Sequence, residues 1–325
     1  MTNRRHLLSL SLLMLGGTTQ ALAQAPAYPS RPITIVAPYS AGSTADMVAR
    51  IIADRLRETL AQPVIIDNRV GAAGSIGTTL VARAPADGYT LLIATQSHTA
   101  NPSLYAKLPW DPIKSFTPIV LVGVIPNVVA VSAASPYKTL ADFVTYAKTR
   151  PDGQVNYASA GVGTSIHLTA EMLKNAAQIK LTHIPYKGDS ESYAALRAGD
   201  VAMAPLGLAF AKSHVDSGEL RALAVTTPKR SRLLPNVPTA AESGFPAFDV
   251  RPWYAFLAPA GTPPAVVAKL NAAITESMKA PAVQAKLLDL GLDLDPGTPE
   301  ALEQFLKTDA ARWEKVIKEA GIRLE

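Results

Sequence analysis

Cysteine is absent from this sequence, and its absence excludes several kinds of chemistry at once. Without thiols the chain forms no disulfide, offers no thiolate nucleophile and builds no cysteine-ligated zinc site or iron–sulfur cluster. It also lacks the cysteine to which a lipoprotein attaches its acyl anchor. Any function therefore depends on hydroxyls, amides, carboxylates, cationic side chains and five histidines.

Charged residues are also few. Charged residues make up 18% of the 325 residues, below the typical value of about 25%, whereas the hydrophobic fraction of 48% is ordinary for a globular protein. Disorder is therefore excluded, and at roughly 150 residues per domain the length predicts two domains. The net charge of +5 includes no basic stripe, since residues 229–232 are expected to form a solvated loop. We expect no nucleic-acid partner.

Hydrophobic runs are short, including the one at the N-terminus. Basic residues at positions 4–6 precede an apolar run over residues 7–15, and small residues follow at 21–23. This order is typical of a secretory signal peptide, here residues 1–23, and the run falls short of the ~20 residues of a spanning helix. A buried helix is the alternative, and paired arginines leave the general and twin-arginine export routes open. Cleavage would lower the net charge to +3, and we expect the mature protein in the bacterial periplasm.

Beyond residue 23, short β-branched runs alternate with amphipathic helical stretches. The alternation predicts α/β domains whose sheets are largely parallel. The expected strands are residues 33–37, 64–66, 89–94, 128–131, 155–158, 181–184, 201–204 and 220–225. The expected helices are residues 44–60, 74–83, 140–148, 164–177, 264–278 and 299–319.

The most apolar stretch of the mature chain covers residues 119–131. Pro126-Asn127 interrupts it, which favours two buried strands meeting at a break over a membrane span. A second crossing is expected near residues 249–253, after a proline-rich segment. Two crossings predict a cleft between a split lobe and an inserted lobe, with residues 24–126 and 250–325 in the first and residues 127–249 in the second.

Small residues gather at three places where an expected strand runs into a helix, namely residues 40–44, 159–164 and 187–190. In open α/β sheets the carboxyl ends of the strands form the ligand crevice, and helix N-termini there present free N–H groups. Such junctions favour an anion. Ordinary turns and helix caps use the same residue types and remain the alternative at each junction.

Short motifs along the chain resemble, in the same order, those of one known family. They include Pro38-Tyr39-Ser40-Ala41-Gly42-Ser43 with Asp46, Asp67-Asn68-Arg69 with Gly71 and Gly74, Asp87-Gly88-Tyr89-Thr90-Leu91, Asn101-Pro102, residues 159–164 with His167-Leu168, Pro185-Tyr186-Lys187-Gly188, Trp253-Tyr254 and Ala258-Pro259-Ala260-Gly261-Thr262-Pro263. The family is the Bordetella uptake gene proteins, the solute receptors of tripartite tricarboxylate transporters. The resemblance covers essentially the whole mature chain.

The resemblance implies an α/β, two-lobed periplasmic-binding-protein (type II) fold with hinge-crossing strands. Its lobes are expected to close over a small carboxylate, which the sequence leaves open as a di-, tri- or aromatic acid. No chemical step, cofactor or metal is expected. The implied partners are a large and a small membrane subunit of the transporter, and we expect the receptor to be a monomer.

Members of the family hold the ligand carboxylate largely through loop backbone, hydroxyls and ordered water. The matching positions on this chain are Tyr39, Ser40, Ala41, Gly42, Ser43 and Thr44 in the first lobe and Ser159, Gly163 and Thr164 in the second. Three departures bear on ligand identity. Ser43 stands where a second glycine is common, Asp189 replaces a common glycine, and Arg251 precedes Pro252-Trp253.

Further side chains are expected near the cleft, each with two interpretations open. Asp46 would meet a ligand amino group or simply stabilise the first helical turn. Ser97 and His98 follow a strand, and His98 would donate to an anion or make a structural hydrogen bond. His167 would contact the ligand or pack in its helix. Lys187 and Arg251 are candidate counter-charges, Arg251 through a bidentate grip, or else surface groups.

Two enzyme classes are the alternatives. Gly161-Val162-Gly163 resembles part of a dinucleotide fingerprint, but Ile166 replaces the third glycine, and Tyr186-Lys187 stands where an acidic ribose ligand is expected. A hydrolase would need a Ser-His-Asp set assembled from distant residues, because the sequence contains no nucleophile elbow and no zinc-binding helix motif.

Overall fold

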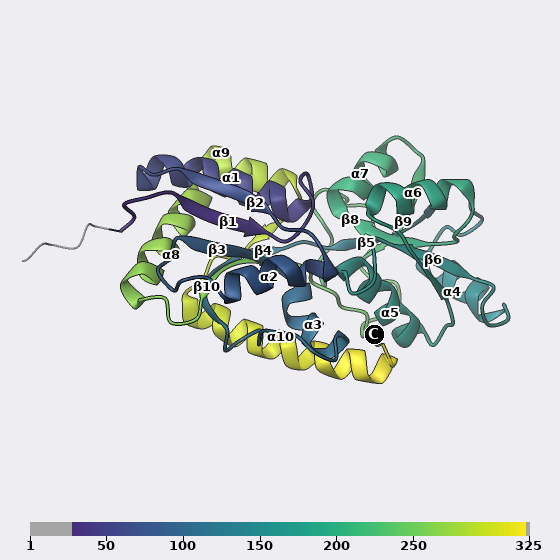
Figure 1. Ribbon diagram of the computed structural model, residues 1–325. Coiled ribbons are helices and arrows are strands. Elements are labelled where there is room, and N and C mark those ends of the chain that lie inside the picture. Colours follow the sequence, from purple (N-terminus) through teal and green to yellow (C-terminus); the bar gives the residue numbers. More distant parts are fainter. Residues whose placement is uncertain (1–27, 323–325) are drawn as a thin grey trace, which may run out of the picture.

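The computed structural model describes residues 28–322, which form two lobes side by side (Figure 1). The first lobe contains a six-stranded sheet in the order β11-β4-β10-β3-β1-β2. Its strands are β1 (Ile33–Ala37), β2 (Val64–Asn68), β3 (Thr90–Thr95), β4 (Phe116–Val124), β10 (Trp253–Pro259) and β11 (Asp293–Leu294). The expected signal peptide lies outside the described residues.

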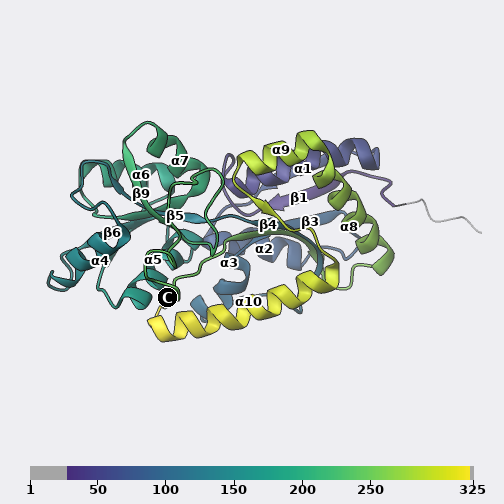
Figure 2. The ribbon, with the colours of Figure 1, turned by 180° about the vertical axis from the view of Figure 1, so that it is seen from behind.

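Helices cover both faces of this sheet, as Figure 1 and Figure 2 show. Ile33 and Ile35 of β1 share a hydrophobic cluster with one group of helices, α1 (Thr44–Leu60), α8 (Pro264–Lys279) and α9 (Pro281–Asp289). Val36, from the alternate face of the same strand, shares another cluster with α2 (Ser75–Ala82) and α10 (Pro299–Ala320). The short helices η1 (Ala72–Gly74) and α3 (Ser97–Leu104) complete the lobe. Because strand side chains alternate, a two-sided apolar strand such as β1 requires cover on both faces.

The helix that leads away from β1 illustrates how local sequence sets these elements. Val48, Ile52 and Leu56 are spaced four residues apart and are buried, as expected for one face of an amphipathic helix. Ser43 begins the helix as its N-cap, since its side chain accepts a hydrogen bond from the N–H of Asp46. The helix therefore starts at the residue that the sequence predicts.

The second lobe is built from smaller sheets. Strands β5 (Asn127–Ser132), β8 (Ala204–Gly207) and β9 (Leu220–Val225) form a three-stranded sheet in the order β8-β5-β9, and β6 (Asn156–Ser159) pairs with β7 (Thr182–Pro185). A parallel bridge between Tyr157 and Met203 connects β6 to the segment that precedes β8. The helices are α4 (Leu140–Lys148), α5 (Ser165–Ala177), α6 (Asp189–Ala198) and α7 (Leu208–Asp216).

The sheets are mixed rather than largely parallel, which corrects the expectation from the sequence. Strands β1, β2 and β3 pair in parallel, but β10 pairs antiparallel with both β3 and β4, and β5 pairs antiparallel with both of its neighbours. The physical reason is the crossing between lobes. Strand β4 leaves the first lobe and β10 returns to it, so the two strands run in opposite directions.

Two segments carry the chain between the lobes, and they lie next to each other. The N–H of Ile125 donates to the carbonyl of Pro252 at 2.8 Å, and the N–H of Val250 donates to the carbonyl of Thr226 at 3.1 Å. The long helix α10 also spans both lobes, because its Trp313 shares a hydrophobic cluster with residues of the second lobe such as Phe143. The exact lobe limits near residues 126 and 249 stay a prediction.

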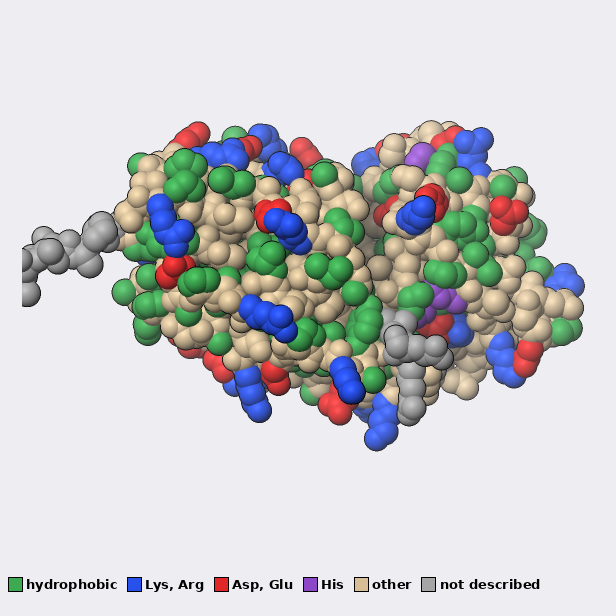
Figure 3. Space-filling model, viewed as in Figure 1, with side chains coloured by type: hydrophobic (Ala, Val, Ile, Leu, Met, Phe, Trp, Pro, Cys, Tyr) green, Lys and Arg blue, Asp and Glu red, His purple; other side chains and the backbone are tan. Residues whose placement is uncertain are grey.

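Helices α3, α6, α7 and α9 were not expected from the sequence, and β8 begins three residues later than its expected position. Within residues 28–322, no helix combines the length and apolarity needed to cross a bilayer. On the face shown in Figure 3, cationic and anionic side chains are interspersed, and the surface is indented where the lobes meet.

Candidate functional site

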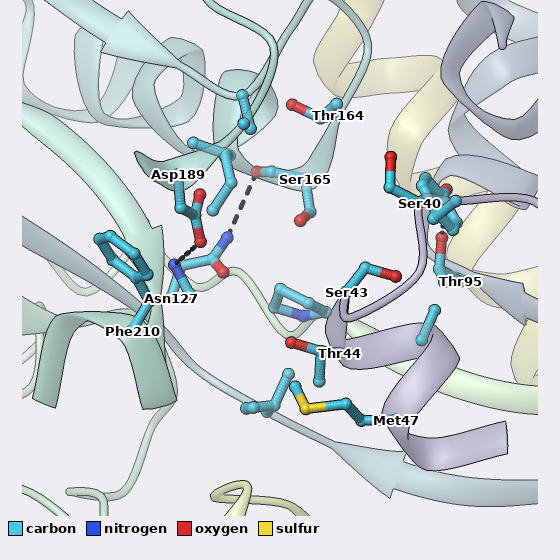
Figure 4. Close-up of a pocket in the computed structure, with 18 of the residues that line it drawn as sticks. Ser40, Ser43, Thr44, Met47, Thr95, Asn127, Thr164, Ser165, Asp189 and Phe210 are labelled. Carbon is cyan, nitrogen blue, oxygen red and sulfur yellow. Dashed lines mark hydrogen bonds between the residues drawn. The ribbon is translucent and has the colours of Figure 1, made fainter. Parts of the chain in front are cut away.

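A cavity of about 540 Å³ lies between the lobes. Figure 4 shows Ser40, Ser43 and Thr44 on one side of this space and Thr164, Ser165 and Asp189 on the other. Its walls come from the loop before α1, the start of α3, the starts of α5, α6 and α7, and both crossing segments. The lining residues are Tyr39–Ala45, Met47, Thr95, Gln96, Ser97, Ile125, Asn127, Ala160, Thr164, Ser165, Ile166, Lys187, Gly188, Asp189, Ser190, Gly207, Ala209, Phe210, Pro252, Trp253 and Tyr254.

Asp46, which is 2% exposed, holds the first-lobe loop from the side away from the cavity. Its carboxylate accepts hydrogen bonds from the N–H of Gly42, the Nε of Arg50 and the Nδ2 of Asn68, each at 2.9 Å. Burial alone would raise the pKa of Asp46, but these hydrogen bonds outweigh it and hold the pKa below its ordinary value. Asp46 is therefore an ionised brace for the loop and does not line the cavity.

This bracing decides which backbone donors of the first lobe remain for a ligand. The N–H of Gly42 is occupied by Asp46, and the N–H of Asp46 is capped by Ser43. The N–H groups of Thr44 and Ala45, in the first turn of α1, have no acceptor among the described residues, and both residues line the cavity. The positive end of the α1 dipole adds to their attraction for an anion.

The second-lobe loop at residues 159–164 is held by two histidines. The Oγ of Ser159 lies 2.6 Å from the Nε2 of His183, and the N–H of Gly163 donates to the Nδ1 of His167 at 3.2 Å. Thr164 caps α5 by accepting from the N–H of His167. The first N–H groups of α5, those of Ser165 and Ile166, again have no acceptor among the described residues, and both residues line the cavity.

The two imidazoles stack with their centroids 4.2 Å apart. Burial lowers the pKa of His167 and of His183 to about 4, and their mutual repulsion contributes to the shift at His183. Both rings are therefore neutral at pH 7 and support the loop rather than supply positive charge. Neither residue lines the cavity.

The pairing of Ser159 with His183 also bears on the hydrolase alternative. Ser159 is fully buried, and its hydroxyl is engaged within its own loop by the N–H of Gly161. The nearby carboxylate of Glu171 is engaged by the phenol of Tyr157 at 2.5 Å and by Lys174. The pair therefore lacks both substrate access and the acid that would orient the imidazole.

The third junction places two charged side chains at the cavity. Lys187 is exposed, whereas Asp189 is the first residue of α6 and accepts a hydrogen bond from the N–H of Gly207 at 3.1 Å. Burial raises the pKa of Asp189 to about 6, against the lowering effect of Gly207. These are the only formal charges among the described residues that line the cavity.

One hydrogen bond links the two lobes directly across the site. The Oγ of Ser97, at the start of α3, donates to the carbonyl of Gly163 at 3.3 Å. Ser97 also lines the cavity. A loop of the second lobe is thus tied to the first lobe at the edge of the cavity.

His98 and Arg251 lie away from the cavity lining. His98 is buried, stacks on Trp110 at 5.1 Å and bonds the carbonyl of Pro112 through Nε2 at 2.8 Å. Desolvation lowers its pKa to about 4, so that it is neutral at pH 7. Arg251 pairs with Asp249 at 2.6 Å, so its guanidinium, one candidate for gripping the ligand carboxylate, is engaged elsewhere.

The structure thus brings together nine of the residues that the sequence indicated. Those lining the cavity are Tyr39, Ser40, Ala41, Gly42, Ser43, Thr44, Ser97, Thr164 and Lys187. Those outside the lining are Asp46, His98, Ser159, Gly163, His167 and Arg251. Four of these residues belong to the loops or support them from the side away from the cavity, namely Asp46, Ser159, Gly163 and His167. The other two, His98 and Arg251, make their contacts with other parts of the protein.

Two lining amides were missed from the sequence. Gln96 is fully buried, and its Nε2 and Oε1 have no hydrogen-bond partner among the described residues. Asn127 begins β5 and donates through Nδ2 to the Oγ1 of Thr169 at 2.8 Å. The same Nδ2 donates to the carbonyl of Ser165 at 3.3 Å (Figure 4). The position of Gln96 directly after a strand was an available signal, because strand ends form the crevice in α/β folds.

Two α/β lobes joined by adjacent crossings around one cavity define a two-lobed solute-binding protein. Solved structures support this class: Rpa4515 of R. palustris with adipate is 37% identical, with a TM-score of 0.84 over 91% of this chain and 100% of that chain. The periplasmic binding protein BugD is 35% identical, with a TM-score of 0.82 over 91% and 100%. MatC of Rhodopseudomonas palustris with bound malate is 33% identical, with a TM-score of 0.80 over 89% and 100%.

The family model described as "Tripartite tricarboxylate transporter family receptor" matches residues 48–322, and the chain belongs to that family. Its sequence is also similar to the "UPF0065 protein in tcbD-tcbE intergenic region" of Pseudomonas sp. strain P51, at 39% identity over 97% of this chain and 94% of that protein. Protein BugT of Bordetella pertussis is 33% identical over the full length of both chains. The resemblance noted in the sequence and the two-lobed fold are confirmed.

Membership of this family makes the protein a receptor rather than an enzyme. The receptors of the family are periplasmic and serve a transporter in the membrane. The nucleotide-dependent and hydrolytic alternatives are therefore not favoured.

Proposed function

We propose that this protein is a periplasmic receptor that captures one small carboxylate between its lobes and delivers it to the large and small membrane subunits of a tripartite transporter. One observation carries the proposal. The free N–H groups at the starts of α1 and α5, one helix from each lobe, belong to residues that line the same cavity of about 540 Å³. A cavity of this size suits a small organic acid.

The energetics of these donors are sufficient without a bound cation. A hydrogen bond to a charged group contributes about 1.5–3 kcal/mol, and a helix N-terminus adds about 0.3–1 kcal/mol. Two free N–H groups from each lobe would therefore support affinity on the order of micromolar. The hydroxyls of Ser43, Thr44 and Ser165, and the amide of Gln96, supply further polar contacts.

The ligands of the solved relatives support the chemical class. Rpa4515 was solved with adipate and MatC with malate, and both ligands are small carboxylates. The large share of hydroxyls and glycine backbone in the present cavity fits such a ligand. The particular acid depends on the residues that differ from the common pattern of the family, which include Ser43 and Asp189.

Delivery requires that the loaded receptor differ from the empty one. A ligand favours closure only by its higher affinity for the closed state. The hydrogen bond from Ser97 to Gly163 joins the lobes at the cavity edge, and in this scheme closure would strengthen such contacts. In this scheme residues 1–23 direct export, the mature protein acts as a monomer, and the membrane subunits recognise the closed form.

Calorimetric titration of the refolded, ligand-stripped mature protein tests the proposal. The panel comprises mono-, di- and tricarboxylates, aromatic acids, amino acids and NADP, and each mixture is assayed for turnover by mass spectrometry. Saturable binding of a carboxylate without turnover is the expected result. Binding of NADP alone, product formation, or no binding of any carboxylate would contradict the proposal.

A further inference from the structure

Asp189 is an acidic side chain in a cavity that otherwise attracts anions. It lies at the first position of α6, on the opposite side of the cavity from Ser43 and Thr44 (Figure 4). One carboxylate oxygen, Oδ2, accepts the N–H of Gly207 at 3.1 Å. A Cβ at Gly207 would lie 3.0 Å from the same oxygen, so the absence of a side chain there leaves the carboxylate its place.

The second oxygen of Asp189 has no donor among the described residues, and the side chain borders the cavity. The ionised carboxylate only accepts hydrogen bonds. Lys187 lies in the same loop but is exposed, and the phenols of Tyr39 and Tyr254 are the titratable groups that face the cavity from the first lobe. No described lining residue is a histidine or arginine, and the one lining cation, Lys187, forms no ion pair with Asp189, so Asp189 stays unneutralised at neutral pH.

The protein itself occupies the carboxylate of Asp46 more fully than that of Asp189. Asp46 was expected to be able to meet a ligand amino group, but it is already satisfied by Gly42, Arg50 and Asn68. Asp189 has a single hydrogen bond from the protein and faces the space that the ligand would fill. The capacity to accept a hydrogen bond from a ligand therefore lies in the second lobe.

We infer that Asp189 determines specificity by selecting a carboxylate whose other end carries a hydrogen-bond donor, either an ammonium or a hydroxyl group. This inference rests on the proposed function. The carboxylate end binds the free N–H groups of the loops, and the donor end binds Asp189. A second carboxylate at that end meets like charge and binds only if it brings a proton.

Three probes of matched length test this inference by calorimetry at pH 7.5, namely γ-aminobutyrate, γ-hydroxybutyrate and glutarate, together with their shorter and longer homologues. The wild-type protein is expected to bind the amino or hydroxy acid at least about tenfold more tightly than the diacid of the same length. Asp189→Asn retains an acceptor for Gly207 and is expected to abolish or reverse this ratio. Asp200→Asn removes the same charge from an exposed position outside the cavity and should leave the ratio unchanged.

The pH dependence separates charge repulsion from shape. In the wild-type protein, diacid affinity should rise as the pH falls through about 6, because burial raises the pKa of Asp189 to about 6 and its proton relieves the repulsion. Asp189→Asn should lose this rise while retaining the protonation of the diacid itself. Asp189→Ser serves as a second variant if the amide variant does not fold, and the wild-type ratio is informative without either.

The outcomes distinguish failure of the role inferred for Asp189 from failure of the proposed receptor function. In one outcome, the wild-type protein binds diacids at least as tightly as the amino and hydroxy acids of the same length, with the same affinity ratio in Asp189→Asn. That result overturns the role of Asp189 and leaves the receptor function standing. A protein that binds none of the carboxylates in either panel contradicts both.

Discussion

Each lobe contributes a loop and the start of a helix to one wall of the cavity, but the side chains that hold the two loops differ in charge. The first-lobe loop is held by an ionised, buried carboxylate, Asp46, which three donors satisfy completely. The second-lobe loop is held by neutral imidazoles, His167 and His183, while the carboxylate of that lobe, Asp189, is left facing the cavity. Under the proposed function, the first wall would supply the anion site, and Asp189 in the second wall would be the feature that selects the ligand.

Because of this difference, the two walls should respond differently to substitutions and to pH. A network around a buried charge is costly to break, because each donor that loses its partner stays desolvated. Neutral stacks are weaker and depend on pH, because protonation places charge in a buried environment. Substitutions and pH changes can therefore address one wall at a time.

Asp46→Ala should have the largest effect. It leaves the N–H of Gly42 and the Nδ2 of Asn68 with one partner fewer, and it frees the loop that presents Thr44 and Ala45. We expect the free energy of unfolding to fall by about 2–3 kcal/mol and carboxylate binding to weaken by about two orders of magnitude. Urea denaturation and calorimetry measure the two effects, and unchanged affinity would show that the loop needs no brace.

Ser165→Pro addresses the second wall. Proline is tolerated at the first position of a helix, and the preceding Thr164 already has the extended backbone that proline requires, with φ −73° and ψ 160°. The variant removes one N–H from the cavity and should weaken carboxylate binding about tenfold. Ser165→Ala retains the N–H and serves as the control. Equal affinities in the two variants would exclude this N–H from binding.

Mild acid should separate the walls. The pKa values of His167 and His183 are lowered to about 4 in the fold, so the unfolded chain binds more protons between about pH 6.5 and 4, and the stabilisation that depends on neutral imidazoles is lost across that window as the pH falls. The pKa of Asp46 is held below its ordinary value, so the first wall should persist through the same window. Hydrogen exchange, corrected for intrinsic rates, should show amides at 159–164 losing protection before that of Gly42. Simultaneous loss would contradict the distinction.

Gln96→Met should have the smallest effect and should change stability and binding in opposite directions. The variant removes two buried polar atoms that have no partner among the described residues. We expect the ligand-free protein to gain about 1 kcal/mol of stability, whereas ligand affinity falls several-fold. Thermal melts with and without the bound carboxylate test this, and a loss of stability without ligand would show that the amide is satisfied in solution.

The sequence predicted those elements best whose ends carry their own signals. Helices α1 and α4 match their expected limits, and both begin at a side-chain cap, Ser43 and Thr139. Helices α3, α6 and α7 begin without a capping side chain, and α3 contains Pro102, which usually disfavours a helix interior. Their positions depend on packing between segments distant in the chain, which periodicity does not report.

The residues that line the cavity were easiest to predict where a strand runs into a helix start. Glycine- and hydroxyl-rich junctions locate helix starts from local sequence, and residues 39–44 indeed line the cavity. Charged side chains were harder to place, because orientation decides their role. Arg251 and His98 were candidate ligand contacts with a structural role left open. Arg251 pairs with Asp249 and His98 bonds the carbonyl of Pro112, contacts that only the folded structure reveals.

Comparing Thr44→Pro with Thr44→Ala measures what the first N–H group of α1 contributes to carboxylate binding. Both variants lose the hydroxyl, but only proline removes the N–H at the first position of α1, and the preceding Ser43 has the extended backbone that proline accepts, with φ −67° and ψ 159°. For the carboxylate that binds the wild-type protein, calorimetry should show affinity about tenfold weaker for Thr44→Pro than for Thr44→Ala, with similar melting temperatures. Equal affinities would contradict the claim that the loop backbone of the first lobe holds the carboxylate.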